Sequence, residues 1–491
     1  MVLGVNMSDV NKFGKRRSCD AAESGELSRD LSNRHIQFIA LGGAIGSGLF
    51  MGAGKTISVS GTSIIFTYMI IGIVLFFVMR AMGELLLSNL KYKNFADFCS
   101  DYIGPWAGFF IGWSYWLTWV VAAVADSVVI GGYIQYWYPN LPTWGPALIV
   151  LTALMFLNLL TVRMFGELEF WFSLVKVVAV ISLIVVGGVL IAISYVSPNG
   201  VTASLSHLVD PAATLPYGIS GFFAGFQIAI FSFAGIEMIG ATAAEAKDPH
   251  KTLPRAINAV PIRVMVFYVL SLICIISVSS WFAISADQSP FVQLFLVTGL
   301  PMAAGMINLV VTTSAISSAN SGIFCTSRTL FGLSAAKQAP NVFSAVTRKK
   351  VPGASLIFSC FCISLGTGLL IFIPKVMTVY TIVSTIASVL LIFIWSLILV
   401  AYLIYRKKNP ELHKASRFKM PWGVPLSIFS LVFFACMIVL LMLEPDTLLA
   451  LSLIPIWVVW LALVYLLKYR HVEIRSYKAE GASYGLDVPG N

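Results

Sequence analysis

Long apolar stretches separated by short polar links run along this chain from about residue 36 to residue 467. An α-helix needs about 20 mainly apolar residues to cross the hydrocarbon core of a bilayer, and most of the stretches approach or exceed that length. The pattern predicts an all-α membrane protein with twelve spanning helices. The expected spans are residues 36–56, 62–82, 106–137, 144–161, 168–194, 218–246, 257–279, 301–333, 354–373, 379–405, 424–443 and 448–467.

The distribution of positive charge predicts the orientation of these spans. With the N-terminus in the cytoplasm, only Lys55 and Lys375 of the 32 Lys and Arg residues lie outside, and Lys176 falls within a span. The opposite orientation would translocate nearly all the other cations, against the positive-inside rule. We therefore expect a cytoplasmic N-terminal arm at residues 1–35 and a cytoplasmic tail at 469–491. The net charge of +10 then reflects topology signals near anionic headgroups, so no nucleic-acid partner is expected.

The composition narrows the class of protein further. The chain is 58% hydrophobic and 11% charged, with a mean hydropathy of +0.87, whereas a soluble protein carries roughly a quarter charged residues. Its seven cysteines are scattered, so neither a disulfide framework nor a metal site is predicted. The links between spans leave no room for a soluble catalytic or signalling domain. We expect neither an enzyme nor a bound cofactor, and no polar stripe repeated across the spans indicates a channel.

Two of the predicted spans are interrupted by small residues. The first interruption is residues 42–48 (GGAIGSG) and the second is 231–237 (FSFAGIE). An unpaired backbone group in hydrocarbon costs several kcal/mol, so a spanning helix breaks only where the freed groups face a cavity or ligand. Broken spans at corresponding positions of two halves indicate the midplane site of a transporter. Residues 36–194 and 218–405 are then two inverted five-helix repeats, and residues 424–467 add two helices.

The two interruptions offer opposite chemistry. A helix that restarts near Ser47 would present the N–H groups of Ser47, Gly48 and Leu49 at its positive end, which suits a carboxylate. The second interruption would release carbonyls of Phe231, Ser232 and Ala234, which suits an ammonium group. Together they predict a site for a zwitterion. The alternative at the first interruption is close helix packing through glycines spaced by four residues.

Three ionisable residues lie at membrane depth, where they are costly unless they face a cavity or a partner. Lys176 is near the midplane of the fifth span and could exchange a proton during transport; the alternative is a lysine that snorkels to the interface. Glu237 follows the second interruption and is a second candidate for proton coupling, unless it pairs with Arg263 or Arg328. Asp126, in the third span, is a candidate to bind a substrate hydroxyl, with packing behind the site as the alternative.

Several motifs resemble those of the bacterial amino-acid permeases of the amino acid–polyamine–organocation superfamily, and the likeness runs from about residue 33 to residue 467. The matching segments are 42–50 (GGAIGSGLF), 79–84 (MRAMGE), 167–172 (ELEFWF), 243–249 (AAEAKDP), 253–258 (LPRAIN) and 317–322 (SSANSG). The resemblance implies the leucine-transporter-type fold and proton symport across a bacterial plasma membrane.

Carried onto this chain, the resemblance implies a substrate carboxylate site at Ala44, Ser47 and Gly48, an amino site at Phe231, Ser232 and Ala234, and proton coupling at Lys176. Ile45 and Phe233, within the two interruptions, are also expected at the substrate. The family more often has Thr where this chain has Ser47, and both residues keep the hydroxyl and the N–H.

The segments 85–90, 222–227 and 288–292 resemble members of the family that carry small neutral amino acids. They imply D-serine, D-alanine, glycine and the analogue cycloserine as substrates. The alternative is another amino acid, such as asparagine or an aromatic one.

Overall fold

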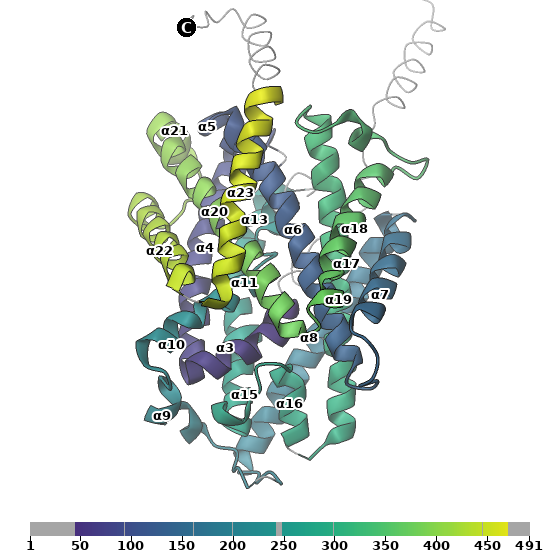
Figure 1. Cartoon of the computed structure of the whole chain (residues 1–491). Coiled ribbons are helices and arrows are strands. Elements are labelled where there is room, and N and C mark those ends of the chain that lie inside the picture. Colours follow the sequence, from purple (N-terminus) through teal and green to yellow (C-terminus); the bar gives the residue numbers. More distant parts are fainter. Residues whose placement is uncertain are drawn as a thin grey trace, which may run out of the picture.

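The computed structural model describes residues 45–92, 94–160, 162–198, 200–241, 248–297, 299–443 and 445–469. In these residues the chain is almost entirely helical, and β pairing is limited to one isolated bridge between Val196 and Thr202. The long helices run side by side in one bundle (Figure 1). The prediction of an all-α protein is thus confirmed for this part of the chain, whereas Ala44 lies outside it.

Of the helices that precede the second interruption, the first is a short π-helical turn at the first interruption. They are η1 (Gly48–Gly52), α3 (Ala53–Ser60), η2 (Gly61–Ser63), α4 (Ile64–Ser88), α5 (Phe95–Tyr102), α6 (Pro105–Ile134), α7 (Trp144–Asn158), α8 (Val162–Ala192), η3 (Leu205–Leu208), α9 (Pro211–Thr214), α10 (Gly218–Ala224) and α11 (Phe226–Phe231).

The helices after the second interruption include the two longest of the described helices. They are α12 (Met238–Ala241), α13 (Pro249–Asn258), α14 (Val260–Arg263), η5 (Val264–Leu270), α15 (Ser271–Ser279), η6 (Trp281–Ala283), α16 (Pro290–Val297), α17 (Pro301–Ala335), η7 (Asn341–Ser344), α18 (Gly353–Thr367), α19 (Leu369–Phe372), α20 (Val376–Lys408), α21 (Pro410–Ala415), α22 (Gly423–Leu443), α23 (Pro445–Val464) and η8 (Tyr465–Tyr469).

Nine helical stretches among the described residues are long and apolar enough to cross a membrane, and Trp144–Asn158 and Gly218–Phe231 are shorter apolar helices. One of the nine, Gly48–Ser88, contains the end of the first predicted span and the whole of the second, which the sequence separates at about residues 56–62. Its helices change direction at Gly61, whose φ of +59° favours glycine. The first two predicted spans therefore follow one another with almost no link.

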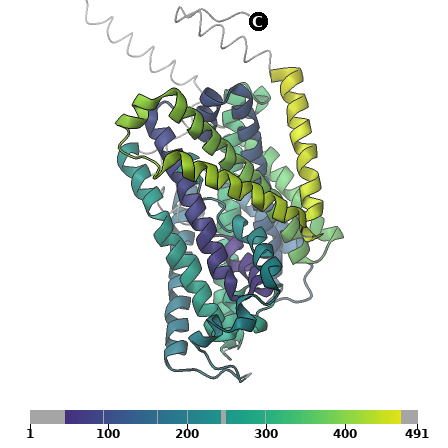
Figure 2. The same ribbon diagram turned by 90° about the vertical axis from the view of Figure 1, so that its left-hand side faces the viewer.

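The centre of the bundle is formed by α6, which packs along α17 and α20. The most apolar window of α6 is 78% buried, against 17% for the last spanning stretch, Thr447–Tyr469. Small residues allow the close approach: a Cβ on Gly322 of α17 would lie 3.0 Å from Ala123 of α6. By contrast α22 crosses the other helices obliquely and α23 stands at the periphery (Figure 2).

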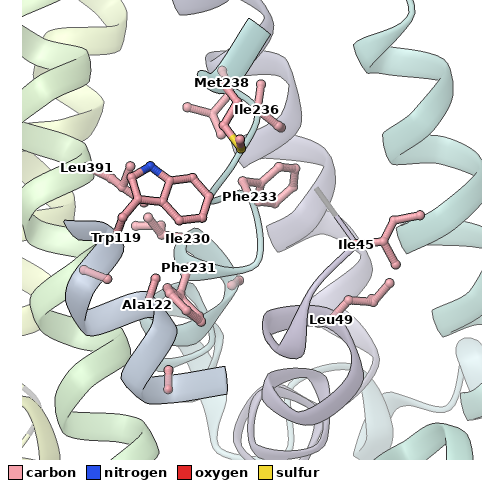
Figure 3. Close-up of a cluster of buried hydrophobic side chains, with 14 of the residues drawn as sticks. Ile45, Leu49, Trp119, Ala122, Ile230, Phe231, Phe233, Ile236, Met238 and Leu391 are labelled. Atoms are coloured by element: carbon pink, nitrogen blue, oxygen red, sulfur yellow. The ribbon is translucent and has the colours of Figure 1, made fainter. Parts of the chain in front are cut away.

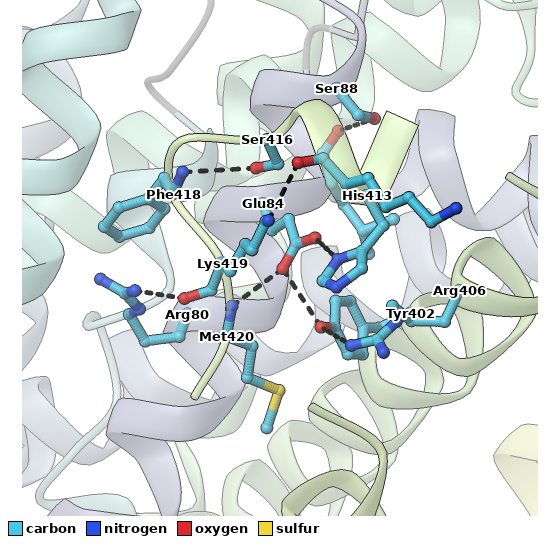
Figure 4. Close-up of polar contacts among 12 residues, drawn as sticks. Arg80, Glu84, Ser88, Tyr402, Arg406, His413, Ser416, Phe418, Lys419 and Met420 are labelled. Atoms are coloured by element: carbon cyan, nitrogen blue, oxygen red, sulfur yellow. Dashed lines mark hydrogen bonds and ion pairs between the residues drawn. The ribbon is translucent and has the colours of Figure 1, made fainter. Parts of the chain in front are cut away.

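A buried carboxylate ties the helices together at the end of the bundle where α21 lies (Figure 4). Glu84 of α4 accepts hydrogen bonds from the Tyr402 hydroxyl (3.1 Å) and the Met420 amide (2.8 Å), and its Oε1 lies 2.5 Å from His413 Nδ1. Arg80, one turn earlier on α4, donates to the Lys419 carbonyl. This network, which we call the Glu84 cluster, fastens α4 to α20 and to the link before α22.

Candidate substrate-binding site

The second interruption separates α11 from α12. After Phe231 the chain runs through turns at residues 232–237, and helix resumes at Met238. Gly235 has a φ of +99°, a conformation that glycine adopts without strain. Its amide donates to both carboxylate oxygens of Glu237, at 3.3 and 3.1 Å, and Glu237 is fully buried. The interruption expected from the sequence is therefore present, and Glu237 holds its own turn together.

Two tyrosines from other helices hold Ser232 inside this interruption. The Tyr268 hydroxyl donates to the Ser232 carbonyl at 2.8 Å, and the hydroxyls of Tyr68 and Ser232 lie 2.8 Å apart. Phe233 stacks on the Tyr268 ring with a centroid separation of 5.1 Å and also contacts Tyr68. We call Tyr68 and Tyr268 the tyrosine clamp. Nothing in the apolar sequence around either residue indicated this role.

Two carbonyls of the second interruption already accept hydrogen bonds from other groups of the protein. The Phe231 carbonyl accepts from the Ala234 amide at 2.9 Å, and the Ser232 carbonyl accepts from Tyr268. Each carbonyl oxygen has two lone pairs and retains capacity for one more donor. An ammonium group would thus meet carbonyls that the protein already orients.

The first interruption is visible from Ile45 onward. Ile45 and Gly46 are bent, and helix begins at Ser47, where the sequence predicts that it restarts. The Leu49 amide donates to the Gly46 carbonyl at 3.2 Å, so the expectation that this amide is free is wrong. The tight turn at the start of η1 uses it, which leaves Ser47 and Gly48 as the amides to consider.

Asp126 of α6 faces the first interruption. The Ser47 hydroxyl donates to Asp126 Oδ1 at 2.5 Å, and the Ser47 amide is directed at the same carboxylate. Both side chains are buried. An internal carboxylate therefore lies against the start of the helix, where the backbone N–H groups favour negative charge.

The two interruptions touch each other. A Cβ placed on Gly48 would lie 2.5 Å from Ser232 Cα and 2.9 Å from Ser232 N. Only glycine permits this approach. The residues expected to bind the two ends of a zwitterion, Ser47 and Gly48 on one side and Ser232 on the other, are consequently neighbours.

The aromatic residues of the second interruption point to different neighbours (Figure 3). Phe231 approaches the Tyr380 ring of α20 edge-on, at 6.0 Å, whereas Phe233 is fully buried against the tyrosine clamp. Ala234 is only partly buried.

Lys176 on α8 is fully buried and interacts electrostatically with Glu169 on the same helix and with Asp126. The structure therefore groups Lys176 with Asp126 and Ser47. Glu237, the second residue expected to couple protons, accepts from the Gly235 amide within the second interruption. In the sequence Glu169 is marked only as part of the motif at 167–172, which assigns it no role.

A cavity of about 820 Å³ reaches toward the first interruption from one end of the bundle. Its inner wall includes Met51, one turn beyond Ser47, together with Tyr133 and Thr381. Its lining also includes Lys55 and Lys375, the two lysines that the charge pattern places outside the membrane. The cavity therefore reaches η1 within about one turn of the first interruption.

Comparison with known proteins identifies the family. The amino acid permease family model matches residues 35–473. The D-serine/D-alanine/glycine transporter of Escherichia coli K12 is 54% identical over 452 residues, which are 92% of this chain and 96% of that protein. The amino-acid permease AapA of Bacillus subtilis is 44% identical over 95% of this chain and 98% of its own. The aromatic amino acid transport protein AroP of Escherichia coli K12 is 36% identical over 90% of this chain and 96% of its own.

The chain belongs to the amino acid permease family and transports amino acids as a multi-pass helical membrane protein.

Proposed function

We propose that this protein is a proton-coupled symporter that imports D-serine, D-alanine and glycine, and also cycloserine, across a bacterial plasma membrane. The observation that carries the site is the contact between Gly48 and Ser232, which brings both interruptions to one place. The substrate assignment rests on the 54% identity with the Escherichia coli D-serine/D-alanine/glycine transporter.

The carboxylate of the substrate binds at the start of the first helix, to the amides of Ser47 and Gly48, with Ala44 and Ile45 beside it. Its ammonium group binds the carbonyls of Phe231, Ser232 and Ala234. Because main-chain groups bind both charged groups of the substrate, the protein distinguishes D- from L-enantiomers only by the space available to the substrate side chain. A pocket for side chains of glycine, alanine and serine size therefore accepts D-enantiomers, and Phe231 and Phe233 limit its size.

The architecture that supports this function is a leucine-transporter-type fold of twelve spans. If Gly48–Ser88 is taken as two spans and the two shorter apolar helices are added, the described helices agree with that number. Residues 36–194 and 218–405 form the inverted repeats, residues 424–467 the two added helices, and residues 1–35 and 469–491 the cytoplasmic ends. The orientation is supported by two groups of cations at opposite ends: Lys55 and Lys375 line the cavity, whereas Arg80 and Arg406 border the Glu84 cluster.

Proton coupling is assigned to Lys176, because it is buried beside Asp126 and Asp126 contacts Ser47 of the first interruption. A change of protonation at Lys176 alters the charge that Asp126 experiences, and hence the contact between α6 and the helix that holds the substrate. Glu237 is the second candidate, because it supports the turn of the second interruption.

Competition for uptake tests the substrate assignment. In vesicles that contain the protein, unlabelled D-serine, D-alanine and glycine should each suppress the uptake of labelled D-alanine, whereas phenylalanine, asparagine and lysine should not. If phenylalanine or asparagine competes and D-alanine is inert, the protein carries another amino acid, which is the alternative that the likeness to AroP keeps open.

A further inference from the structure

Helix α8 carries one inward polar stripe on an otherwise lipid-facing surface. Glu169, Ser173 and Lys176 are each fully buried, whereas Trp171 and Val178 on other faces are 61% and 54% exposed. Spacings of four and three residues place the three polar side chains on one face of the helix. Seven residues separate Glu169 from Lys176, about 10 Å along the helix axis. In the proposed orientation, Glu169 is on the cytoplasmic side of Lys176.

Helix α17 surrounds Glu169 with neutral polar groups. Ser317 donates to Glu169 Oε1 at 2.8 Å. Asn320 and Ser321 also face this carboxylate, but in the described part of the chain Glu169 Oε2, Asn320 Nδ2 and Ser321 Oγ are buried without a hydrogen bond of good geometry. The Asn320 carbonyl oxygen accepts from Asn158 Nδ2 at 2.7 Å, which fixes the orientation of the amide. Buried polar groups in this state are costly and are usually satisfied by water or by a small movement.

An aromatic pair closes the helix surface one turn beyond Glu169. Phe165 of α8 stacks on Phe324 of α17 with ring centroids 3.7 Å apart and nearly parallel planes. The guanidinium of Arg328 covers the same Phe324 ring at 3.3 Å. Glu169 therefore lies between Lys176 and an aromatic barrier on the side toward the proposed cytoplasm.

Lys176, Asp126 and Glu169 form a buried group of one cation and two acids. With all three ionised the group has a net charge of −1, and one bound proton makes it neutral. Burial in a low-dielectric region penalises net charge, so the group is suited to hold one exchangeable proton. Among the described residues, Tyr133 and Tyr380 are titratable groups that face this trio, on the Asp126 side; α17 faces Glu169 with the neutral residues named above.

We propose that Glu169 is the cytoplasmic proton acceptor of the transport cycle, an inference that rests on the proposed coupling role of Lys176. In the neutral group Glu169 is protonated and Lys176 is an ammonium. The Glu169 proton leaves for the cytoplasm when the Phe165–Phe324 pair separates, which gives the group a net charge of −1. The Lys176 ammonium then gives its proton to a Glu169 carboxylate oxygen, which yields a neutral amine and a carboxylic acid, and the amine takes up a new proton from the substrate side. Ser317, Asn320 and Ser321 orient the carboxylate, and a water molecule between the two side chains would carry the proton.

The experiment uses the full chain reconstituted in liposomes and measures two rates for D-alanine. One is accumulation driven by an imposed pH gradient, and the other is exchange of internal for external D-alanine without a gradient. At one proton per substrate, a gradient of about one pH unit supports about tenfold accumulation. Glu169→Gln should retain exchange while losing this accumulation, and the pH dependence of its exchange should flatten. Val178→Ala, on the 54% exposed face of the same helix and away from the acid, should retain both.

The ratio of accumulation to exchange decides the outcome, because a folding defect lowers both rates together. A ratio in Glu169→Gln equal to wild type overturns the role of Glu169. If too little of this variant reaches the membrane, the same ratio in Glu169→Asp decides: a reduced ratio supports the proposal and an unchanged one overturns it. Lys176→Met separates the two hypotheses. If Lys176→Met loses accumulation while Glu169→Gln accumulates normally, Lys176 couples protons without Glu169. If both variants accumulate normally, the coupling proposal for Lys176 is rejected as well.

Discussion

Gly48 and Ser232 pack backbone against backbone, so that a Cβ on Gly48 would lie 2.5 Å from Ser232 Cα. The contact joins two helices that are far apart in the sequence, each at the point where it is interrupted. It brings the backbone of one interruption against the backbone of the other. The proposed substrate, with a carboxylate and an ammonium group, would use groups from both.

This contact predicts that Gly48 tolerates no side chain. Gly48→Ala should reduce D-alanine uptake at least tenfold and Gly48→Val should abolish it, because either Cβ displaces the Ser232 backbone; such overpacking costs about 1–3 kcal/mol. The control is Gly332→Ala on α17, where a Cβ has open space. Uptake and the amount of protein in the membrane would be measured together. Normal transport by Gly48→Val would show that transport does not require the close contact between Gly48 and Ser232.

The tyrosine clamp predicts an effect on substrate affinity. Tyr268→Phe removes the donor to the Ser232 carbonyl, and a hydrogen bond of this kind contributes about 0.5–1.5 kcal/mol. We expect the KM for D-alanine to rise several-fold with a smaller change in maximal rate. Tyr405→Phe is the matched control, because among the described residues the Tyr405 hydroxyl is buried with no hydrogen-bond partner. Equal effects of the two substitutions on KM would show that the tyrosine clamp does not contribute to substrate binding.

Asp126 is expected to discriminate among the small substrates. Its carboxylate accepts from Ser47 and has lone pairs for a further donor, such as the hydroxyl of serine. Asp126→Asn should therefore weaken inhibition by D-serine more than inhibition by glycine, measured against labelled D-alanine. If both inhibitors weaken by the same factor, Asp126 supports the helix and does not contact the substrate side chain.

The Glu84 cluster predicts a large effect on stability. Glu84→Ala would leave the Tyr402 hydroxyl, the Met420 amide and His413 without their shared acceptor, at a cost of about 2–4 kcal/mol. The apparent melting temperature of the detergent-solubilised protein should fall by several degrees. Glu411→Ala should change it little, because the Lys414–Glu411 ion pair has side chains 72% and 82% exposed. Equal melting temperatures for the two variants would contradict the structural role of Glu84.

Much of the architecture follows from local features of the sequence. Apolar length reveals the spanning helices, and the cost of an unpaired backbone group in hydrocarbon makes a glycine cluster such as 42–48 informative. At the second interruption Gly235 adopts the positive φ that a break requires. The link expected near residues 56–62 contains Thr56, Ser58, Ser60 and Thr62, yet it is helical on both sides of Gly61, where the chain changes direction.

The partners of the interrupted segments depend on packing and lie beyond the reach of a single sequence. Tyr68 and Tyr268 sit in apolar surroundings that are typical of lipid-facing or core aromatics, and only the fold brings their hydroxyls to Ser232. The Leu49 amide shows the converse error: a helix start offers free N–H groups in general, yet the turn at Gly46 uses this one. Glu169 lies within a segment recognised by its motif, but its contact with Ser317 emerges only when α8 meets α17.

The most direct test of the account is accumulation of labelled D-alanine in sodium-free proteoliposomes with an imposed pH gradient. The account predicts that wild-type protein concentrates D-alanine when the outside is acidic, and that Lys176→Ala exchanges D-alanine without concentrating it. Accumulation that needs sodium, or that persists at the wild-type level in Lys176→Ala, would contradict the assignment of proton coupling to this lysine.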